Sequence, residues 1–538
     1  MSKLPTTAAQ LNRAMQLHRR GDIGSAAQIY RQIVDHEPAN ADAWQLLGVI
    51  ARQTGKHDLA LQLLSTALQH NPRHAPALAN HAILLRESGD LTAARRQAEA
   101  GLRADPACAD VHSAMGGVCQ AERDYETALR HFRRALQLQP GQAELYNNIA
   151  AAEQRLDHLP AAYAAITEAL RLDPEAAHFY NTRGNILRTG GYPDLACADF
   201  AEAARRDPSL TGVVINEALA RLLTGDFTRG WELFARRGKP DARYATLPLW
   251  NGDPIPQGTL LLAVEQGLGD TLQFVRLIPW AAARAGQVVL EVQPPLRELM
   301  ASSFPDIQTL AQGDPLPGTV THYCRLMELA RLMQLGADNI PGAVLYLKTP
   351  PTAVPPVAAE QPVIGLVWAG NPDHLNDAKR SLRLEQLRPV LEPYQRHIVS
   401  LQKGKQAEEL RQTGFSIIDG GAGLDDFTAT AALLSKIDLL ITADTSVAHL
   451  AGALGRPVWI MLPYDPDWRW QLERRDVPWY PTAKLYRQPA PGDWGAVLAE
   501  IGRDLAVLMQ GGRAVLTPPA WKQPVPGRQG HGAAFRPA

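Results

Sequence analysis

The sequence predicts an α-helical repeat solenoid followed by an α/β region that contains parallel sheets. Two observations carry this prediction. Prolines recur with a constant step of 34 residues as far as Pro208, and from about residue 250 onward short apolar strands alternate with polar turns and helical stretches. A chain of 538 residues is long enough for about three domains of ordinary size, each with its own core.

Three positions of the 34-residue unit are visible in the sequence. The first is a proline, which ends the second helix of a unit: Pro38, Pro72, Pro106, Pro140, Pro174 and Pro208. The other two are small residues where two antiparallel helices approach closely: Ala26, Ala60, Ala94, Ala128, Ala162 and Ala196, and Ala14, Gly48, Ala82, Gly116, Ala150 and Gly184. The pattern resembles the tetratricopeptide repeat. We expect an array over residues 1–240, with six repeats and a partial seventh through Gly225, Phe227 and Gly230.

The patterned residues of this array are needed for helix packing, so none of them is a catalytic candidate. Stacked helix pairs curve into a superhelix with a concave surface. We therefore expect the array to bind a partner or an acceptor, or to mediate homo-oligomerisation.

Two α/β halves are predicted after the array, over residues 250–348 and 363–510. The first half has expected strands at 259–264, 288–292, 307–310 and near Val320, and a helix from Thr271 to about Ala283. The second has expected strands at 363–368, 396–402, 416–418, 439–443 and 458–462. Residues 349–362 are rich in proline and alanine and predict a stiff linker, and residues 511–538 predict a disordered tail.

A phosphate-binding site is predicted within the stretch DLLITADTSVAHLAGALGRPVWIMLP, residues 438–463. The pattern of this stretch predicts a strand, a polar turn, a helix and another strand. Asp444, Thr445 and Ser446 are residues that cap helix N-termini, and the unpaired N–H groups and dipole of such a terminus favour an anion. The local pattern fits an ordinary capped crossover helix equally well.

Ligands of doubly wound sheets bind at the carboxyl ends of the strands. The polar motifs lie at those ends: EQGLGD in the first half, and WAGNPDH, LQKG and TADTSVAH in the second. Two halves that face each other across the linker would therefore form a cleft lined by these loops.

The segments EQGLGDTLQF (265–274) and TADTSVAHLAGALGRPVWIMLP (442–463), with the continuation PYDPDWRW, resemble the heptosyltransferase-like family, glycosyltransferase family nine, in its branch fused to tetratricopeptide repeats. The resemblance covers about residues 255–505. It implies a GT-B fold of two facing Rossmann-like domains, an inverting reaction and a nucleotide-sugar donor, without a cofactor.

The resemblance also assigns residues. Asp270 matches the proposed general base, although an Asp with Gln273 three residues later also forms a helix-capping pair. The donor diphosphate site is matched by Asp444, Thr445, Ser446, Val447 and His449, together with a basic residue that is either Lys379 or Arg380. Candidate nucleotide or sugar contacts are Gly267, Gly269, Gln402 and Lys403. The segment WAGNPDHLNDAKRS departs from the family pattern, so the donor sugar stays open.

Other chemistries are less well supported by the sequence. A dinucleotide fingerprint at Gly267 and Gly269, with Glu291 as the ribose acid, lacks its third glycine. Asp465-Pro466-Asp467 has the DxD form of metal-dependent glycosyltransferases, but a turn explains it equally well, and we expect no metal. An aromatic cluster either stacks on a ligand or packs a C-terminal lid: Trp468, Trp470, Trp479 and Tyr480.

Composition limits the partners and the compartment. A net charge of −1 without a long basic block disfavours nucleic acid and anionic membranes, and no stretch of the sequence suits a membrane span. The four cysteines show no CxxC spacing, and the N-terminus lacks an apolar signal core, so we expect a cytoplasmic protein.

The sequence therefore predicts a nucleotide-sugar-dependent glycosyltransferase whose repeats select a protein or glycan acceptor. Two alternatives remain open. One is a non-catalytic repeat scaffold with a vestigial nucleotide-binding domain. The other is an enzyme like the protein O-linked N-acetylglucosamine transferases, which share the architecture.

Overall fold

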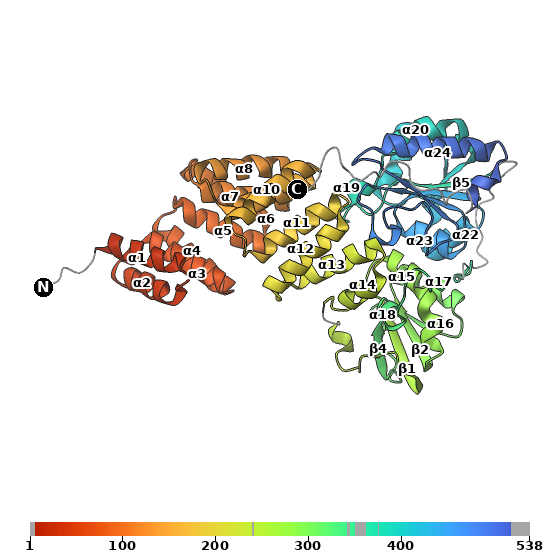
Figure 1. Ribbon diagram of the computed structural model, residues 1–538, viewed down its shortest axis with the longest axis horizontal. Coiled ribbons are helices and arrows are strands. Elements are labelled where there is room, and N and C mark those ends of the chain that lie inside the picture. The colour runs from red at the N-terminus through yellow and green to blue at the C-terminus, as the bar shows by residue number, and fades with distance from the viewer. Residues whose placement is uncertain (1–5, 239–240, 342–344, 350–361, 375, 518–538) are drawn as a thin grey trace. The chain divides into compact units, whose positions relative to one another are not determined.

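A computed structural model describes residues 6–238, 241–341, 345–349, 362–374 and 376–517. The chain divides into two compact units, one that runs to Ile186 and one that begins at Leu187 (Figure 1). The predicted linker residues 350–361 and the tail residues 518–538 lie outside the described residues. Among the described helices, none combines the length and the apolar character that a membrane crossing requires.

The first unit consists of helices of nearly constant length. In chain order they are α1 (Thr7–Arg19), α2 (Ile23–His36), α3 (Ala41–Gln53), α4 (His57–His70), α5 (Ala75–Glu87), α6 (Leu91–Ala104), α7 (Ala109–Ala121), α8 (Tyr125–Leu138), α9 (Ala143–Arg155) and α10 (Leu159–Leu172). Each odd-numbered helix packs on the next, so the unit is built of helix pairs, and α11 (Ala177–Thr189) crosses into the second unit.

The small residues of the 34-residue pattern lie where the paired helices meet, as predicted. Ala26, Ala60 and Ala94 are fully buried, and a methyl group added to Gly48 would lie 2.8 Å from Leu64 of the partner helix. The repeat prolines follow two residues after the even-numbered helices, Pro38 after His36 for example, because proline cannot continue the helix.

The predicted end of the array near residue 240 is not where the chain divides. Helices α12 (Pro193–Arg206), α13 (Thr211–Thr224) and α14 (Phe227–Phe234) belong to the second unit, because α13 and α14 share one hydrophobic core with the α/β region. Trp231 of α14 shows how: its indole N–H donates to the Leu335 carbonyl at 2.9 Å, and its ring meets Trp468 edge to face at 5.3 Å.

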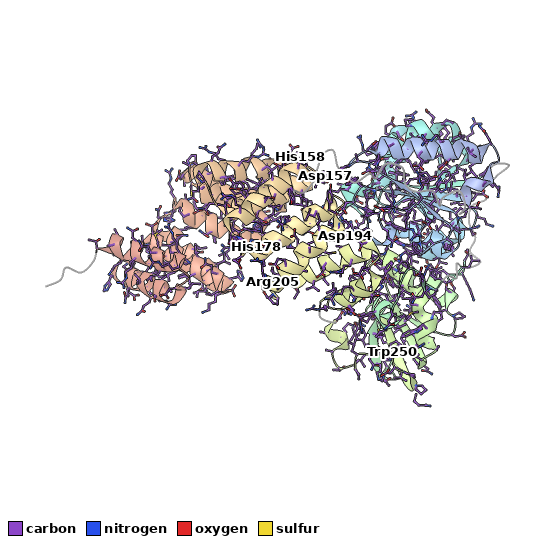
Figure 2. The ribbon with its side chains drawn as sticks, viewed as in Figure 1. Asp157, His158, His178, Asp194, Arg205 and Trp250 are labelled. Atoms are coloured by element: carbon purple, nitrogen blue, oxygen red, sulfur yellow. The ribbon has the colours of Figure 1, made fainter. Side chains whose placement is uncertain are left out.

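The first sheet has four parallel strands in the order β3-β2-β1-β4, with bounds β1 (Ile255–Ala263), β2 (Ala285–Val292), β3 (Gln308–Ala311) and β4 (His322–Arg325). Trp250, buried just before β1, lies in this part of the chain (Figure 2). One face of the sheet carries helices. The other is covered by the segment around Tyr244, whose ring stacks on Tyr323 with 4.5 Å between the centroids.

The second sheet has six parallel strands in the order β10-β9-β8-β5-β6-β7. Their bounds are β5 (Ile364–Val367), β6 (Ile398–Ser400), β7 (Ile418–Asp419), β8 (Leu439–Ala443), β9 (Val458–Leu462) and β10 (Ala483–Arg487). The chain reverses its direction of winding between β5 and β8, which therefore flank the topological switch point where such sheets bind ligands.

Helices cover both faces of the second sheet (Figure 1). Alternate strand residues such as Leu366 and Ile441 face α20 (Leu384–Leu391) and α24 (Trp494–Met509), whereas Val367 and Leu440 share the core that contains α22 (Phe427–Leu434) and α23 (Ser446–Ala453). This alternation makes the sheet doubly wound, as predicted.

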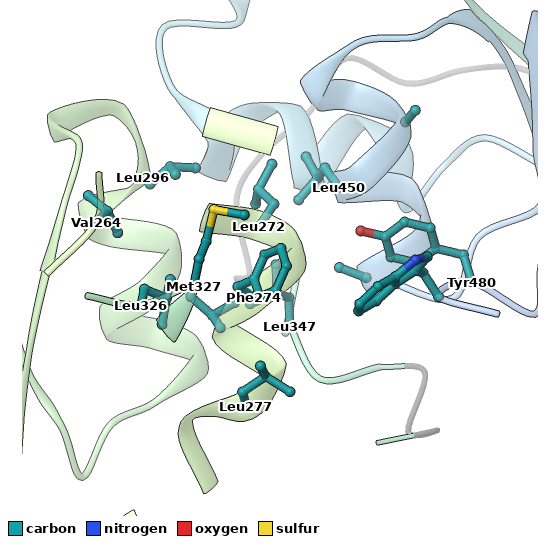
Figure 3. Close-up of a cluster of buried hydrophobic side chains, with 14 of the residues drawn as sticks. Val264, Leu272, Phe274, Leu277, Leu296, Leu326, Met327, Leu347, Leu450 and Tyr480 are labelled. Carbon is teal, nitrogen blue, oxygen red and sulfur yellow. The ribbon is translucent and has the colours of Figure 1, made fainter. Parts of the chain in front are cut away.

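Helix α15 (Leu268–Phe274) of the first half packs on α23 of the second half. Leu272 and Leu450 are fully buried in one cluster with Phe274 and Tyr480 (Figure 3). The two sheets therefore share a hydrophobic core and do not form separately packed lobes.

Three details differ from the sequence prediction. The first helix after β1 begins at Leu268 and not at Thr271, and it breaks into α15, a 3₁₀ turn over Val275–Leu277 and α16 (Ile278–Ala282), where Pro279 restarts the helix. Strand β10 and helix α24 were not predicted. Residues 513–516 form a 3₁₀ helix whose Val515 and Leu516 pack against the second sheet's core, so ordered structure continues past residue 511.

Gly116 and Gly117 provide a matched test of the helix packing. A methyl group at Gly116 would lie 2.5 Å from the buried Phe132 ring, whereas at Gly117 the nearest atom is in the Arg86 side chain at 3.4 Å. We expect Gly116→Ala to destabilise the α7–α8 pair by about 1–3 kcal/mol through overpacking. Gly117→Ala should stabilise it by up to about 1 kcal/mol through helix propensity. Hydrogen–deuterium exchange of α7 and α8 measures both, and equal effects would contradict this packing.

Candidate functional site

A cavity of about 1140 Å³ lies within the second unit, where loops at the carboxyl ends of both sheets meet. The structure describes all of the predicted site residues. All of them except Lys379 line this cavity. The cavity is large enough for a nucleotide-sized ligand.

The N-terminus of helix α23 opens onto the cavity directly after strand β8. Thr445 is the N-cap residue, yet its side chain makes no capping bond, and its hydroxyl lies 3.2 Å from the Thr442 hydroxyl. The expected side-chain cap is therefore absent. Ser446 and Val447, whose backbone N–H groups belong to the unpaired first turn of the helix, line the cavity, so this terminus can bind an anion.

His449 is held by aromatic neighbours. Its Nδ1 lies 2.9 Å from the Tyr480 hydroxyl, and its ring stacks on Trp470 with 5.2 Å between the centroids. Burial and the nearby Arg469 and Arg276 lower the pKa of His449 well below its usual value, so the ring is neutral and cannot serve as a cation for a diphosphate.

Two glycines allow the aromatic cluster to close around His449. A methyl group at Gly269 would lie 2.8 Å from the His449 ring, and one at Gly452 would lie 2.4 Å from Tyr480. The four predicted aromatic residues are almost fully buried in the core of the second unit, so they pack the interior and do not form a lid: Trp468, Trp470, Trp479 and Tyr480. Trp468 also lines the cavity.

Asp444 is buried at the end of β8. Desolvation and the neighbouring Asp467 raise its pKa above the usual value, although Arg380 and Arg469 act in the opposite direction. An ionised carboxylate repels a diphosphate, so the predicted role of Asp444 as a direct phosphate ligand does not fit its charge. A carboxylate at this position suits hydroxyl donors instead.

The structure distinguishes the two basic candidates after strand β5. Arg380, in the short helix α19 (Asp377–Arg380), lines the cavity and lies 3.5 Å from the Asp377 carboxylate. Its guanidinium rests on the backbone of Gly370, where a methyl group would be only 2.6 Å from Nη2. Of the two, Arg380 is therefore the one that can reach a ligand in the cavity, and its charge acts on Asp444, which directly precedes the N-cap residue of α23.

Gln402 has a different role from the predicted nucleotide contact. Its Oε1 accepts hydrogen bonds from the backbone N–H groups of Trp368 and Ala369, both at 3.0 Å, and its Nε2 donates to the Ala369 and Lys403 carbonyls, also at 3.0 Å. The amide thus fixes the ends of β5 and β6 to each other. Lys403 is exposed at the cavity rim, and its ammonium group donates to the Leu424 carbonyl.

Asp270 lies in the first turn of α15. The N-cap residue is Gly267, whose backbone N–H donates to Asp270 Oδ2 at 2.8 Å, so the predicted capping pair of Asp270 with Gln273 does not form. Oδ1 accepts a hydrogen bond from Arg469, which lies in the loop after β9. Asp270 lines the cavity with 21% of its side-chain surface exposed, and burial raises its pKa although Arg469 opposes that shift.

Several residues that line the cavity were not predicted. Arg469 is a single arginine between two tryptophans, and no sequence pattern links it to Asp270. The cavity is also lined by Arg188 at the end of α11 and by Asn216, Leu219 and Leu223 of α13. Helical spacing places these α13 residues near one face, but the sequence did not show what that face meets.

The carboxylates of the DxD sequence are paired with arginines. Asp465 lies 2.8 Å from Arg188, and Asp467 lies 2.7 Å from Arg469. Within the described residues, no group of three or more His, Cys, Asp or Glu side chains is placed to hold one metal ion. Glu291, the candidate ribose acid, is buried beneath Tyr244 and Arg243 and cannot reach a ligand.

Comparison with known proteins identifies the repeats. A family described as tetratricopeptide repeat matches residues 11–75, and a second family with the same description matches residues 51–117. The chain therefore contains tetratricopeptide repeats.

Individual proteins are similar over parts of the chain. Protein FlbA of Caulobacter vibrioides is 26% identical over 326 residues, which are 53% of this chain and 53% of FlbA, so the chain spans about half the length of this relative. A thermophilic repeat protein of Thermus thermophilus is 23% identical, with a TM-score of 0.31 over 34% of this chain and 99% of its own. A tetratricopeptide repeat protein of Parabacteroides merdae is 19% identical, with a TM-score of 0.33 over 43% and 91%.

The raised pKa of Asp444 predicts that this residue lowers the free energy of unfolding at high pH. The folded state binds this proton more tightly than the unfolded state, so the free energy of unfolding falls as pH rises from the unfolded to the folded pKa. We expect Asp444→Asn to stabilise the protein at about pH 8, by on the order of 1 kcal/mol, and to have little effect at about pH 4. Urea unfolding followed by tryptophan fluorescence measures the difference.

Asp426→Asn is the control, because asparagine keeps the N-cap bond that Asp426 makes to Ala429. Destabilisation by Asp444→Asn at high pH would show that the carboxylate is stabilised by its arginine neighbours and would contradict this prediction.

Proposed function

We propose that the protein is a glycosyltransferase that transfers a sugar from a nucleoside-diphosphate sugar to a hydroxyl acceptor, with its two α/β halves in a GT-B arrangement. One observation carries the proposal: the uncapped N-terminus of α23 and the Asp270 carboxylate come from different sheets and line the same cavity. An anion site and a candidate base are thus near each other, as this reaction needs.

The donor diphosphate would bind at the N-terminus of α23, beside the switch point between β5 and β8. The backbone N–H groups of Ser446 and Val447 and the Arg380 guanidinium would contact its oxygens. Asp444 would accept hydrogen bonds from hydroxyl groups of the sugar, which is a role that its negative charge permits.

Transfer would be a single displacement at the anomeric carbon. The acceptor oxygen attacks that carbon while Asp270 takes the hydroxyl proton, and the bond from the carbon to the phosphate oxygen breaks. Charge that develops on the departing nucleoside diphosphate is stabilised by the α23 terminus and Arg380. Attack on the face opposite the leaving group inverts the anomeric configuration.

The repeat helices would contribute to acceptor selection. Asn216, Leu219 and Leu223 of α13 line the cavity that Asp270 lines, and the Arg188–Asp465 ion pair joins the end of α11 to the loop after β9. An acceptor that reaches Asp270 would therefore pass residues of the last repeats.

A second function is favoured by the two contacts of the Asp270 carboxylate. Both oxygens of Asp270 already have partners, Gly267 and Arg469, which a purely structural residue would also have. The alternative is a scaffold protein that binds a nucleotide without transferring a sugar.

The Asp270→Asn variant separates the two functions. Asparagine keeps the size of the side chain but cannot accept the acceptor proton, so we expect the transfer rate to fall by about 10²–10⁴-fold while donor binding is retained. A panel of nucleotide sugars first identifies the donor by thermal shift, and intact mass identifies the transferred sugar. A variant as active as the wild type would exclude Asp270 as the base, and a wild type that binds but never transfers would support the scaffold.

Arg380 and Lys379 are neighbours in the sequence, and of the two only Arg380 lines the cavity. We expect Arg380→Gln to weaken nucleoside-diphosphate binding by about tenfold or more, because it removes a charge-assisted hydrogen bond to the phosphates. Lys379→Gln should change the affinity by less than about twofold. Isothermal titration with UDP, GDP, ADP and CDP measures both, and a larger effect of Lys379→Gln would place the anion elsewhere.

A further inference from the structure

Arg469 donates side-chain hydrogen bonds to three residues, two of which, Asp270 and Gln273, lie in α15. Its side chain is only 9% exposed, and its guanidinium uses all three nitrogens: Nη2 donates to Asp270 Oδ1, Nη1 to Asp467 Oδ1 at 2.7 Å, and Nε to Gln273 Oε1. The Trp468 ring supports the group from one side, with 4.5 Å between Cζ and the ring centroid.

Two of these contacts cross between the two halves of the second unit. Asp270 and Gln273 lie in α15 after the first sheet, whereas Arg469 and Asp467 lie in the loop that follows β9 of the second sheet. Gln273 is fully buried, so one of the three partners that fix this arginine is a group that solvent does not reach. A lysine could not replace it, because one ammonium group cannot reproduce a planar fork with three bonds.

With Arg469 in place, the Asp270 carboxylate is held at both oxygens. The Gly267 N–H fixes Oδ2 at 2.8 Å and Arg469 fixes Oδ1, which leaves the carboxylate one orientation at the cavity wall. A base must be oriented as well as ionised to take a proton in the transition state.

We propose that Arg469 is a positioning residue for sugar transfer, which orients the Asp270 carboxylate at the cavity wall. This inference rests on the proposed function. It assigns to the second half of the fold a direct influence on the base that the first half carries.

The charges around Asp270 give the direction of the effect. Burial and Asp467 raise the pKa of Asp270, and Arg469 lowers it. Asp444 and the neutral His449 line the same cavity, and the charges that act on them are those of Arg380, Arg276, Asp467 and Arg469 itself. A general base acts only when deprotonated, so activity is lost as pH falls through its pKa, and any change that raises this pKa moves the acid limb of the rate profile to higher pH.

Two substitutions should therefore shift the acid limb in opposite directions. Arg469→Gln removes the cation that lowers the pKa of Asp270. It should move the acid limb of kcat/KM to higher pH, by about 1–3 pH units. Asp467→Asn removes the like charge, and the asparagine can keep the capping bond to the Arg469 N–H, so the limb should move downward. A role in folding alone would lower the rate at every pH without moving the limb.

The experiment measures kcat/KM against pH for the full chain with the donor identified by the thermal-shift panel. Arg469→Lys is the second variant in case Arg469→Gln does not fold; it keeps the charge, so we expect a smaller shift of the limb together with a lower kcat. Arg475→Gln is the control, because Arg475 lies in the same loop, is partly buried and pairs with Glu500 instead of Asp270. It should leave the limb unchanged.

The outcomes separate this inference from the proposed function. Opposite shifts for Arg469→Gln and Asp467→Asn support it. If the wild type transfers sugar and Asp270→Asn does not, but neither variant moves the limb, the role of Arg469 is wrong and the function stands. If Arg469→Lys loses donor affinity but its acid limb does not shift, Arg469 contacts the donor itself. That result would also overturn the inference. If the wild type transfers no sugar, both proposals fail.

Discussion

The close packing of α15 on α23 is the contact on which the site depends. Leu272 and Leu450 bury this contact in a core that both sheets share, and Gly269 lets the α15 turn come against the His449 ring, where a methyl group would be 2.8 Å from the nearest ring atom. Because these helices follow β1 and β8, their packing brings the polar ends of two separate sheets to one cavity. A bulkier residue at Gly269 would push the loops apart, and Asp270 would no longer share a cavity with the α23 terminus.

The cavity combines carboxylates and guanidinium groups in a small volume. Asp270, Asp444 and Asp467 lie around Arg469 and Arg380, so the burial of Asp270 and Asp444 is partly offset by arginines. This arrangement reduces stability, since the pKa values of Asp270 and Asp444 are raised. Perturbed carboxylates in a cleft are typical of catalytic sites, where groups are kept for chemistry although they cost stability. The arginines that neutralise the negative charge of these carboxylates can also neutralise the negative charge of a bound diphosphate.

Local patterns made much of the fold predictable. The 34-residue step predicted the helix pairs. Two short apolar runs predicted β8 and β9 with the bounds that the structure shows. Contacts between distant segments were not predictable: Arg469 meets Asp270 across 199 residues, and α13 and α14 join the α/β core because Trp231 meets Trp468. The role of Gln402 was missed for the same reason, since its four backbone bonds depend on how β5 and β6 are aligned. The sequence also predicted a side-chain cap among Asp444, Thr445 and Ser446, but the N-cap residue Thr445 makes no capping bond, which leaves the helix terminus open to a ligand.

In the proposed function, a nucleoside-diphosphate sugar binds in the cavity between the α23 terminus and Asp270. A crystal structure of the full chain with the donor identified by the thermal-shift panel would show this complex. We expect diphosphate oxygens within hydrogen-bond distance of the Ser446 and Val447 N–H groups and of Arg380, with the anomeric carbon on the side of Asp270. A diphosphate bound away from α23, or a sugar directed away from Asp270, would contradict it.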